Sequence, residues 1–131
     1  MRNSEQGVLS PVGAWQSSVT FPNGMVQQSL IQYSQDGNVT EANTRFASRL
    51  TGIGLWRQTG EHTFEAFFEK FLFEVGEESP KVWVRVVCNA TLNETGDAYE
   101  GEAKGIFMNM DRKILNSIPC KAKAARLDWS V

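Results

Sequence analysis

Hydrophobic and polar residues alternate along much of the chain, and the longest alternating runs lie between residues 62 and 111. Three runs rich in aromatic and β-branched residues are separated there by turn clusters at 76–80 and 94–97. Alternation with a period of two, interrupted by Gly, Pro, Asn and Asp, is typical of strands joined by hairpins. We therefore predict three long antiparallel strands in this stretch.

The first half of the chain predicts shorter hairpins behind a loose arm at residues 1–11. The sequence Pro22-Asn23-Gly24 favours a turn, because proline presets φ and glycine accepts positive φ. Pairing across this turn places Trp15 opposite Ile31, on the same face as Tyr33.

The dipeptide Asp36-Gly37 is the strongest short hairpin signal in the chain. Taken as a tight turn, it determines which residues of the next strand share the face of Tyr33. That inner set is predicted to be Thr40, Ala42, Thr44 and Phe46, and the solvent-facing set Val39, Glu41, Asn43 and Arg45.

Alternation carried across the turn at Thr95-Gly96 separates an inner from an outer face in the later strands. The predicted inner residues of that hairpin are Val82, Val84, Val86, Cys88 and Ala90 beside Tyr99, Gly101, Ala103, Gly105 and Phe107. The matching inner set of the preceding strand is Phe64, Ala66, Phe68, Lys70 and Leu72.

The inner set of that preceding strand depends on the length of the loop at 76–80. An error of one residue there would turn its other face inward. The alternative lumen would hold the paired carboxylates Glu65 and Glu69 with Trp56, Trp83 and Arg85, and it would form an active site suited to acid–base chemistry.

After a looser segment around Pro119, where residues 112–118 could form one helical turn, a last strand is predicted with Ala122, Ala124 and Arg126 on one face. Residues 1–131 then form a single all-β domain of about eight strands. An antiparallel up-and-down meander of this size removes its edges by closing into a barrel. The small residues between Ala90 and Gly105 favour a cavity over a filled core.

Composition narrows the function classes. The chain has 131 residues and a net charge of −2 without a basic block, which argues against nucleic-acid binding. No apolar run reaches the length of a membrane span, and the polar start lacks the apolar segment of a signal peptide, so we expect a cytoplasmic protein. Cys88, His62 and Cys120 do not have the spacing of a metal site, and we expect no metal and no cofactor.

The segment Gly13-Ala14-Trp15 resembles the Gly-x-Trp signature of the lipocalins and the wider calycin superfamily. Arg126 lies where that superfamily often places an arginine that packs over the tryptophan and closes the barrel base. The resemblance implies a lipocalin-like barrel of the kind found among bacterial cytoplasmic proteins. Such proteins include small-molecule binders and cofactor-free cyclases or isomerases of natural-product pathways.

Candidate functional residues are those that the predicted alternation points into the lumen, together with the single histidine. A lysine among apolar residues is partly desolvated and can serve as an amine nucleophile or a carboxylate anchor; the alternative is that Lys70 lies near the barrel mouth and extends its ammonium group to water. Histidine suits acid–base work near neutral pH; the alternative for His62, in a turn beside Gly60, is an exposed side chain without a role. The candidate catalytic residues are Lys70, Tyr99 and His62, and the candidate ligand-binding residues are Trp15, Tyr33, Arg57, Phe64, Phe68, Val84 and Phe107.

Several apolar residues are predicted to project from the outside of the barrel, where contiguous apolar patches usually mark an interface. We expect either the N-terminal arm to cover this patch or a homodimer to form through Phe67, Phe71, Phe73 and Trp83.

The sequence leaves three functions open. The first is binding of a small, largely apolar molecule in the lumen, with a few polar side chains to orient it. The second is a cofactor-free cyclase or isomerase that holds a polyketide- or terpenoid-type substrate in a reactive conformation in the same cavity. The third is a dimeric structural module with a filled core.

Overall fold

The computed structural model describes residues 2–3, 8–44, 50–74 and 76–130, and within these ranges every regular element is a β-strand. The strands are β1 (Arg2–Asn3), β2 (Val8–Leu9), β3 (Gly13–Thr20), β4 (Val26–Tyr33), β5 (Asn38–Asn43), β6 (Gly52–Gln58), β7 (Thr63–Leu72), β8 (Val82–Leu92), β9 (Ala98–Met108) and β10 (Ile114–Arg126).

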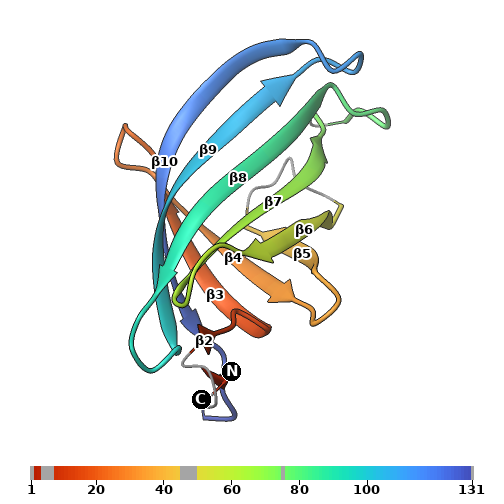
Figure 1. The fold of residues 1–131 in the computed structure, drawn as a ribbon. Helices are drawn as coiled ribbons and strands as arrows, with labels where there is room; N and C mark the ends of the chain where they lie inside the picture. The colour runs from red at the N-terminus through yellow and green to blue at the C-terminus, as the bar shows by residue number, and fades with distance from the viewer. Residues whose placement is uncertain (1, 4–7, 45–49, 75, 131) are drawn as a thin grey trace.

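Strands β3 to β10 follow one another around a closed antiparallel barrel, which β10 completes by pairing with β3. The predicted eight-stranded up-and-down barrel is therefore confirmed. Both chain ends and β2 lie at one end of the barrel, here termed the base, and the long strands β8, β9 and β10 rise to the opposite end, the mouth (Figure 1). No helix among the described residues is long and apolar enough to cross a membrane.

A cation–π contact closes the base. The guanidinium of Arg126 lies 4.3 Å from the ring centroid of Trp15 and donates hydrogen bonds to the carbonyl oxygens of Ser10, Val12 and Gly96. A side chain at Gly13 would meet the guanidinium at 2.6 Å, and its φ of +132° also favours glycine. The predicted packing of Arg126 over Trp15 is confirmed.

Above this contact, aromatic rings fill the lumen next to the base. Tyr99 packs edge-on against both Trp15 and Phe64, with centroid distances of 4.8 and 5.2 Å, and Tyr33 packs against Phe64 at 5.3 Å. Leu9, from the segment expected to be an arm, is buried in the same cluster. Small residues such as Ala90 and Ala124 leave room for these rings, so part of the small-residue wall surrounds a filled base.

The registers predicted for the β3–β4 and β8–β9 hairpins are confirmed. Trp15 pairs with Ile31 across β3 and β4, and Leu92 pairs with Tyr99 across β8 and β9. In β7 the buried residues are Phe64, Ala66, Phe68, Lys70 and Leu72. The alternative that places Glu65 and Glu69 in the lumen is thereby excluded.

The predicted faces of β5 are wrong. Tyr33 pairs with Val39, and Ser34 and Asn38 flank a three-residue loop in which Gly37 has φ +90°. Such a loop contains one residue more than the tight turn read from Asp36-Gly37, and a shift of one residue exchanges the two faces of a strand. Val39 and Glu41 are consequently buried, whereas Thr40 and Ala42 are exposed; Arg45 and Phe46 lie outside the described residues.

The closing strand is longer than predicted, because residues 114–119 extend β10 where a helical turn was considered possible. β10 pairs with β9 along this extension, with a bulge between Ile114 and Asn116, and pairing with β3 begins at Lys121. Pro119 is tolerated because a proline, which lacks an N–H group, can occupy a strand with one open edge.

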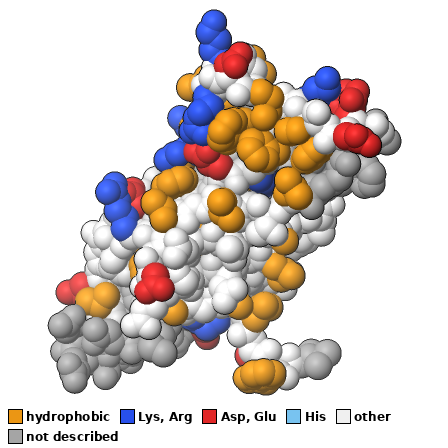
Figure 2. All heavy atoms as spheres, turned by 90° about the vertical axis from the view of Figure 1, so that its right-hand side faces the viewer, with side chains coloured by type: hydrophobic (Ala, Val, Ile, Leu, Met, Phe, Trp, Pro, Cys, Tyr) orange, Lys and Arg blue, Asp and Glu red, His pale blue; other side chains and the backbone are white. Residues whose placement is uncertain are grey.

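The outer face of β7 and β8 carries an electrostatic cluster among its aromatic residues. Glu69 accepts hydrogen bonds from Trp83, Arg85 and Arg112, and the two guanidinium groups stack over the rings of Phe67 and Trp83 at 3.7 and 4.4 Å. Figure 2 shows hydrophobic side chains mixed with charged ones on one side of the molecule. The outer aromatic residues are therefore half-buried by their own neighbours, and the homodimer through this face stays a prediction.

We expect Arg126→Met to lower the free energy of unfolding by about 2–4 kcal/mol, since it removes the cation–π contact and leaves partly buried carbonyl groups without a donor. Lys121→Met, an exposed position of the same strand, is the control, with an expected change within about 0.5 kcal/mol. Urea unfolding of both variants measures the difference, and equal losses would contradict the role assigned to Arg126.

The cluster around Glu69 predicts a pH-dependent stability. The pKa of Glu69 is lowered from 4.5 to about 2. The hydrogen bonds from Arg112 have the largest effect, and those from Arg85 and Trp83 have smaller ones. The stabilisation is complete above pH 4.5 and is lost as the pH falls through about 2, because the unfolded state takes up the proton first.

Glu69→Gln should therefore reduce the free energy of unfolding by about 1–2 kcal/mol at pH 7 and by much less at pH 2.5. Glu65→Gln is the matched control, because Glu65 lies four residues earlier on the same face and pairs with the exposed Arg57. A pH-independent loss in the Glu69 variant would contradict this assignment.

Candidate ligand-binding site

A cavity of about 60 Å³ lies in the lumen above the aromatic base. Its walls are mostly apolar and come from every barrel strand except β6. Its apolar walls include Phe21, Phe68, Val84, Ala103 and Phe107, its thiols are Cys88 and Cys120, and its polar groups come from Ser17, Gln27, Ser29, Tyr33, Glu41, Lys70 and Tyr99.

A buried ion pair occupies one side of this cavity. The ammonium nitrogen of Lys70 lies 3.5 Å from Oε2 of Glu41, and the two side chains are 5% and 1% exposed. The hydroxyl of Ser29 donates to Glu41 Oε2 at 2.9 Å, and the amide of Asn43 donates to both carboxylate oxygens. These neighbours are all donors, an arrangement that suits an ionised carboxylate.

Two tyrosines form the floor of the cavity. The hydroxyl groups of Tyr33 and Tyr99 share a hydrogen bond of 2.8 Å, and their rings belong to the aromatic base. Burial is the main factor that raises the pKa of both phenols well above the usual value of 10. Both hydroxyl groups are therefore neutral near pH 7.

Two thiols lie on the opposite wall. Burial raises the pKa of Cys88 to about 12 and also raises that of Cys120, so both remain protonated near pH 7. Each pairs with Ala103, one from either side, which separates the two cysteines by two strand spacings of about 4.8 Å each. A disulfide requires closer Cα atoms, and both cysteines are free.

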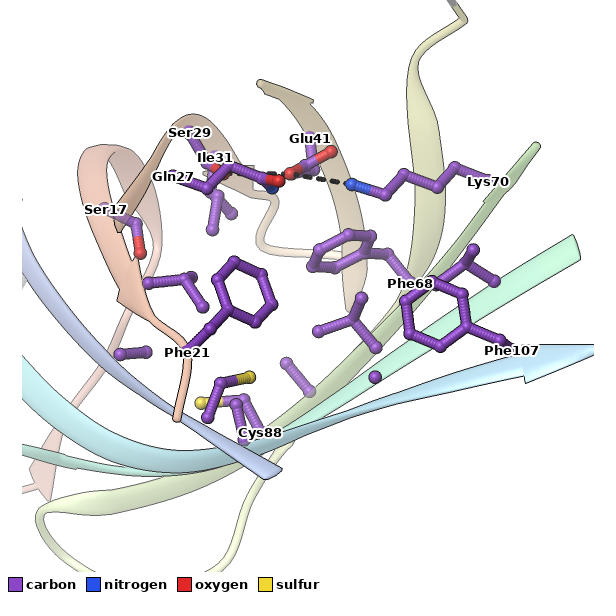
Figure 3. Close-up of a pocket in the computed structure, with 18 of the residues that line it drawn as sticks. Ser17, Phe21, Gln27, Ser29, Ile31, Glu41, Phe68, Lys70, Cys88 and Phe107 are labelled. Atoms are coloured by element: carbon purple, nitrogen blue, oxygen red, sulfur yellow. Dashed lines mark hydrogen bonds and ion pairs between the residues drawn. The ribbon is translucent and has the colours of Figure 1, made fainter. Parts of the chain in front are cut away.

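The ring of Phe21 lies between the cavity and the mouth. Figure 3 shows Phe21, Phe68 and Phe107 projecting into the space between the Glu41–Lys70 pair and Cys88. Phe21, Gln27 and Phe107 also line a second hollow of about 760 Å³, the mouth groove, whose other walls include Met25, Val26, Val82, Leu115 and Ile118. The cavity and the mouth groove are therefore adjacent, with aromatic side chains at the boundary.

The structure brings together six of the residues proposed from the sequence. They are Lys70, Tyr99, Tyr33, Phe68, Val84 and Phe107, all of which line the cavity. Trp15 and Phe64 instead belong to the filled base, because they lie closest to the closed end of the barrel. They contribute to the shape of the floor and do not line the cavity.

Arg57 and His62 lie away from the cavity. Arg57 pairs with Glu65 across β6 and β7 on the outer face, and its side chain is 79% exposed, so its predicted position in the lumen is wrong. In β6 the inward residues are the neighbours of those that the prediction with Arg57 inside requires. Trp56, instead of Arg57, packs against the core. His62 lies in the turn before β7, where its carbonyl oxygen accepts a hydrogen bond from the amide of Leu92.

The sequence reading missed Glu41, the partner of Lys70. A two-residue turn at Asp36-Gly37 predicts that Glu41 faces solvent, whereas the three-residue loop turns it into the lumen. The requirement that a buried ammonium have a partner would have pointed to an inward carboxylate on a nearby strand. The lining residues Phe21, Ser17 and Ser29 follow from the predicted alternation, but they carry no motif that marks them as functional.

The described residues contain no group of three or more His, Cys, Asp and Glu side chains placed to hold a metal ion. The ion pair, hydroxyl and amide groups that line the cavity can form hydrogen bonds and exchange protons with a bound molecule.

Comparison with known proteins supports the fold and leaves the family open. No family model matches the sequence, and no curated protein matches it. Among solved structures, the chain is similar to one described as EF1p2_mFAP2b bound to DFHBI, with 12% sequence identity and a TM-score of 0.64. The alignment covers 94% of this chain and 96% of that one. The likeness establishes a shared barrel architecture.

The ion pair predicts a strong energetic coupling. Lys70→Met should lower the free energy of unfolding by about 3–5 kcal/mol, because it leaves a buried carboxylate without its counter-charge. The double variant Glu41→Gln/Lys70→Met should be at least about 1 kcal/mol more stable than Lys70→Met alone. Urea unfolding of the wild type, both single variants and the double variant measures this coupling, and additive effects would show that the two side chains do not interact.

Proposed function

We propose that this protein binds one small, largely apolar molecule in its barrel lumen. The observation that carries the proposal is the buried Glu41–Lys70 pair on the wall of an apolar cavity. A buried ion pair contributes little to stability compared with apolar residues of similar size, because desolvation offsets most of its Coulomb energy. Its presence beside a cavity is better explained by a polar group of a ligand.

The rest of the site has the composition of a small-molecule pocket. Such pockets combine apolar and aromatic walls with a few polar groups that orient the ligand. Here Phe68, Val84 and Phe107 provide the wall, and Lys70 and Glu41 provide the orienting groups. The similar barrel described as bound to DFHBI is consistent with this use of the architecture.

The volume defines how the ligand would be seated. A cavity of about 60 Å³ is smaller than the roughly 300–1,000 Å³ of typical ligand pockets. We therefore infer that the ligand places its polar end in the cavity and its apolar end in the mouth groove, with Phe21 turning aside between them.

The second candidate is a cofactor-free cyclase or isomerase. A carboxylate and an ammonium group 3.5 Å apart in an apolar cavity are positioned to move a proton on a bound molecule. If this is the function, Glu41→Gln abolishes turnover of a bound substrate and leaves its affinity nearly unchanged. If the protein is a carrier, neither the wild type nor the Glu41→Gln variant converts a bound compound.

The carrier proposal is tested with N-phenyl-1-naphthylamine, a neutral apolar molecule whose fluorescence rises when it leaves water. We expect saturable binding to the wild type and at least tenfold weaker binding to Ala103→Val, whose two added methyl groups occupy the cavity. Ala125→Val is the matched control, because Ala125 is exposed on the outside of β10.

Saturable binding that Ala103→Val leaves unchanged would show that the probe sits elsewhere on the protein. Absence of binding to the wild type, together with a native mass spectrum free of co-purifying small molecules, would favour the filled structural module.

A further inference from the structure

We propose that the ligand presents to the Glu41–Lys70 pair an uncharged group that both donates and accepts hydrogen bonds, such as a hydroxyl or a primary amide. This inference rests on the proposed function and specifies the chemistry of the polar end of the ligand.

The first argument is the charge balance of the cavity. The ionisable side chains that line it are Tyr33, Glu41, Lys70, Cys88, Tyr99 and Cys120 among the described residues. The phenols and thiols are neutral near pH 7, because burial raises the pKa of each. Among the described residues, the carboxylate of Glu41 and the ammonium group of Lys70 are then the two charged groups of the walls, and their charges are opposite.

A charged ligand would disturb this balance. A carboxylate near Lys70 would also lie near Glu41, whose Oε2 is 3.5 Å from the ammonium nitrogen, and an ammonium group near Glu41 would likewise lie near Lys70. Either ligand would add one uncompensated charge to an apolar, buried space. Burial of an unpaired charge costs far more free energy than burial of a hydrogen-bonded neutral group.

The second argument is hydrogen-bond complementarity. Glu41 offers acceptor oxygens, and Lys70 offers an ammonium group with N–H donors, side by side on β5 and β7 (Figure 3). Their separation of 3.5 Å exceeds the roughly 2.7–2.9 Å of a direct charge-assisted hydrogen bond. A hydroxyl or amide can donate to the carboxylate and accept from the ammonium group at once, whereas an ether or ketone can only accept.

The surrounding polar residues agree with a neutral group. Ser17, Gln27 and Ser29 also line the cavity, and each has a side chain that can both donate and accept. The nearest charged residues of the outer cluster, Glu69 and Arg85, face the other side of the β7–β8 wall. They therefore do not supply a compensating charge inside the lumen.

The test uses three ligands that share an eight-carbon skeleton: octanamide, octanoate and octylamine. Each is titrated at pH 7 against the wild type loaded with N-phenyl-1-naphthylamine. We expect octanamide to displace the probe at a concentration at least tenfold lower than octanoate or octylamine, which are both ionised at this pH. Octyl methyl ether, an acceptor without a donor, should be several-fold weaker than octanamide.

Two variants change the charge of the cavity without altering its outline greatly. Glu41→Gln gives the walls a net positive charge, so octanoate should gain at least tenfold relative to octanamide. Lys70→Met gives them a net negative charge, so octylamine should gain instead. The double variant Glu41→Gln/Lys70→Met restores neutrality and should again disfavour both ions. If Lys70→Met does not fold, the wild type and Glu41→Gln decide the matter.

The outcomes separate this inference from the proposed function. Displacement of the probe by octanoate or octylamine at a concentration equal to or below that of octanamide overturns the inference and leaves lumen binding intact. Failure of the probe itself to bind the wild type overturns both. Tenfold preference for octanamide, with the two opposite shifts in the single variants, supports both.

Discussion

Closure of the sheet between β3 and β10 is the constraint on which the rest of this structure depends. Six residue pairs, from Lys121 and Thr20 to Arg126 and Trp15, join the two ends of the meander. Once the sheet is closed, every second side chain of each strand must face the lumen. The cation–π contact of Arg126 with Trp15 sits at the last of these pairs, so the closing register and the sealed base are fixed together.

The lumen that results is divided along its length by residue size. Near the base, Trp15, Phe64 and Tyr99 fill the space and require small neighbours on β8 and β10. Nearer the mouth, Ala103 and Gly105 line the cavity. Small residues thus allow close packing of aromatic rings at one end of the barrel and line a cavity at the other. For this reason composition alone does not reveal the volume of the cavity.

Most of the architecture follows from the sequence because alternation with a period of two is strong in β7, β8 and β9. Where an error arose, it came from a loop. One additional residue in the Asp36-Gly37 hairpin moved Glu41 from solvent to the lumen, and an offset in β6 moved Arg57 outward. Both errors concern the choice of face. Alternation along a strand shows that its two faces differ in polarity, whereas the length of the preceding loop decides which face points into the lumen. For short strands such as β5, whose pattern is mostly polar, the alternation of hydrophobic and polar residues does not by itself correct the assignment.

The buried Lys70 shows how physical chemistry can supply that correction. The alternation places Lys70 on the inward face, as the structure confirms, but its side chain is buried and does not extend to water. A buried ammonium group without a counter-charge costs several kcal/mol. In a closed barrel the partner must come from an inward position of another strand, and Glu41 is the acidic residue that the cavity walls provide. The pair places opposite charges within a neutral, apolar lumen, at a distance longer than a direct hydrogen bond. This combination favours recognition of a polar but uncharged group, a specificity that arises from the balance of the two residues and from neither one alone.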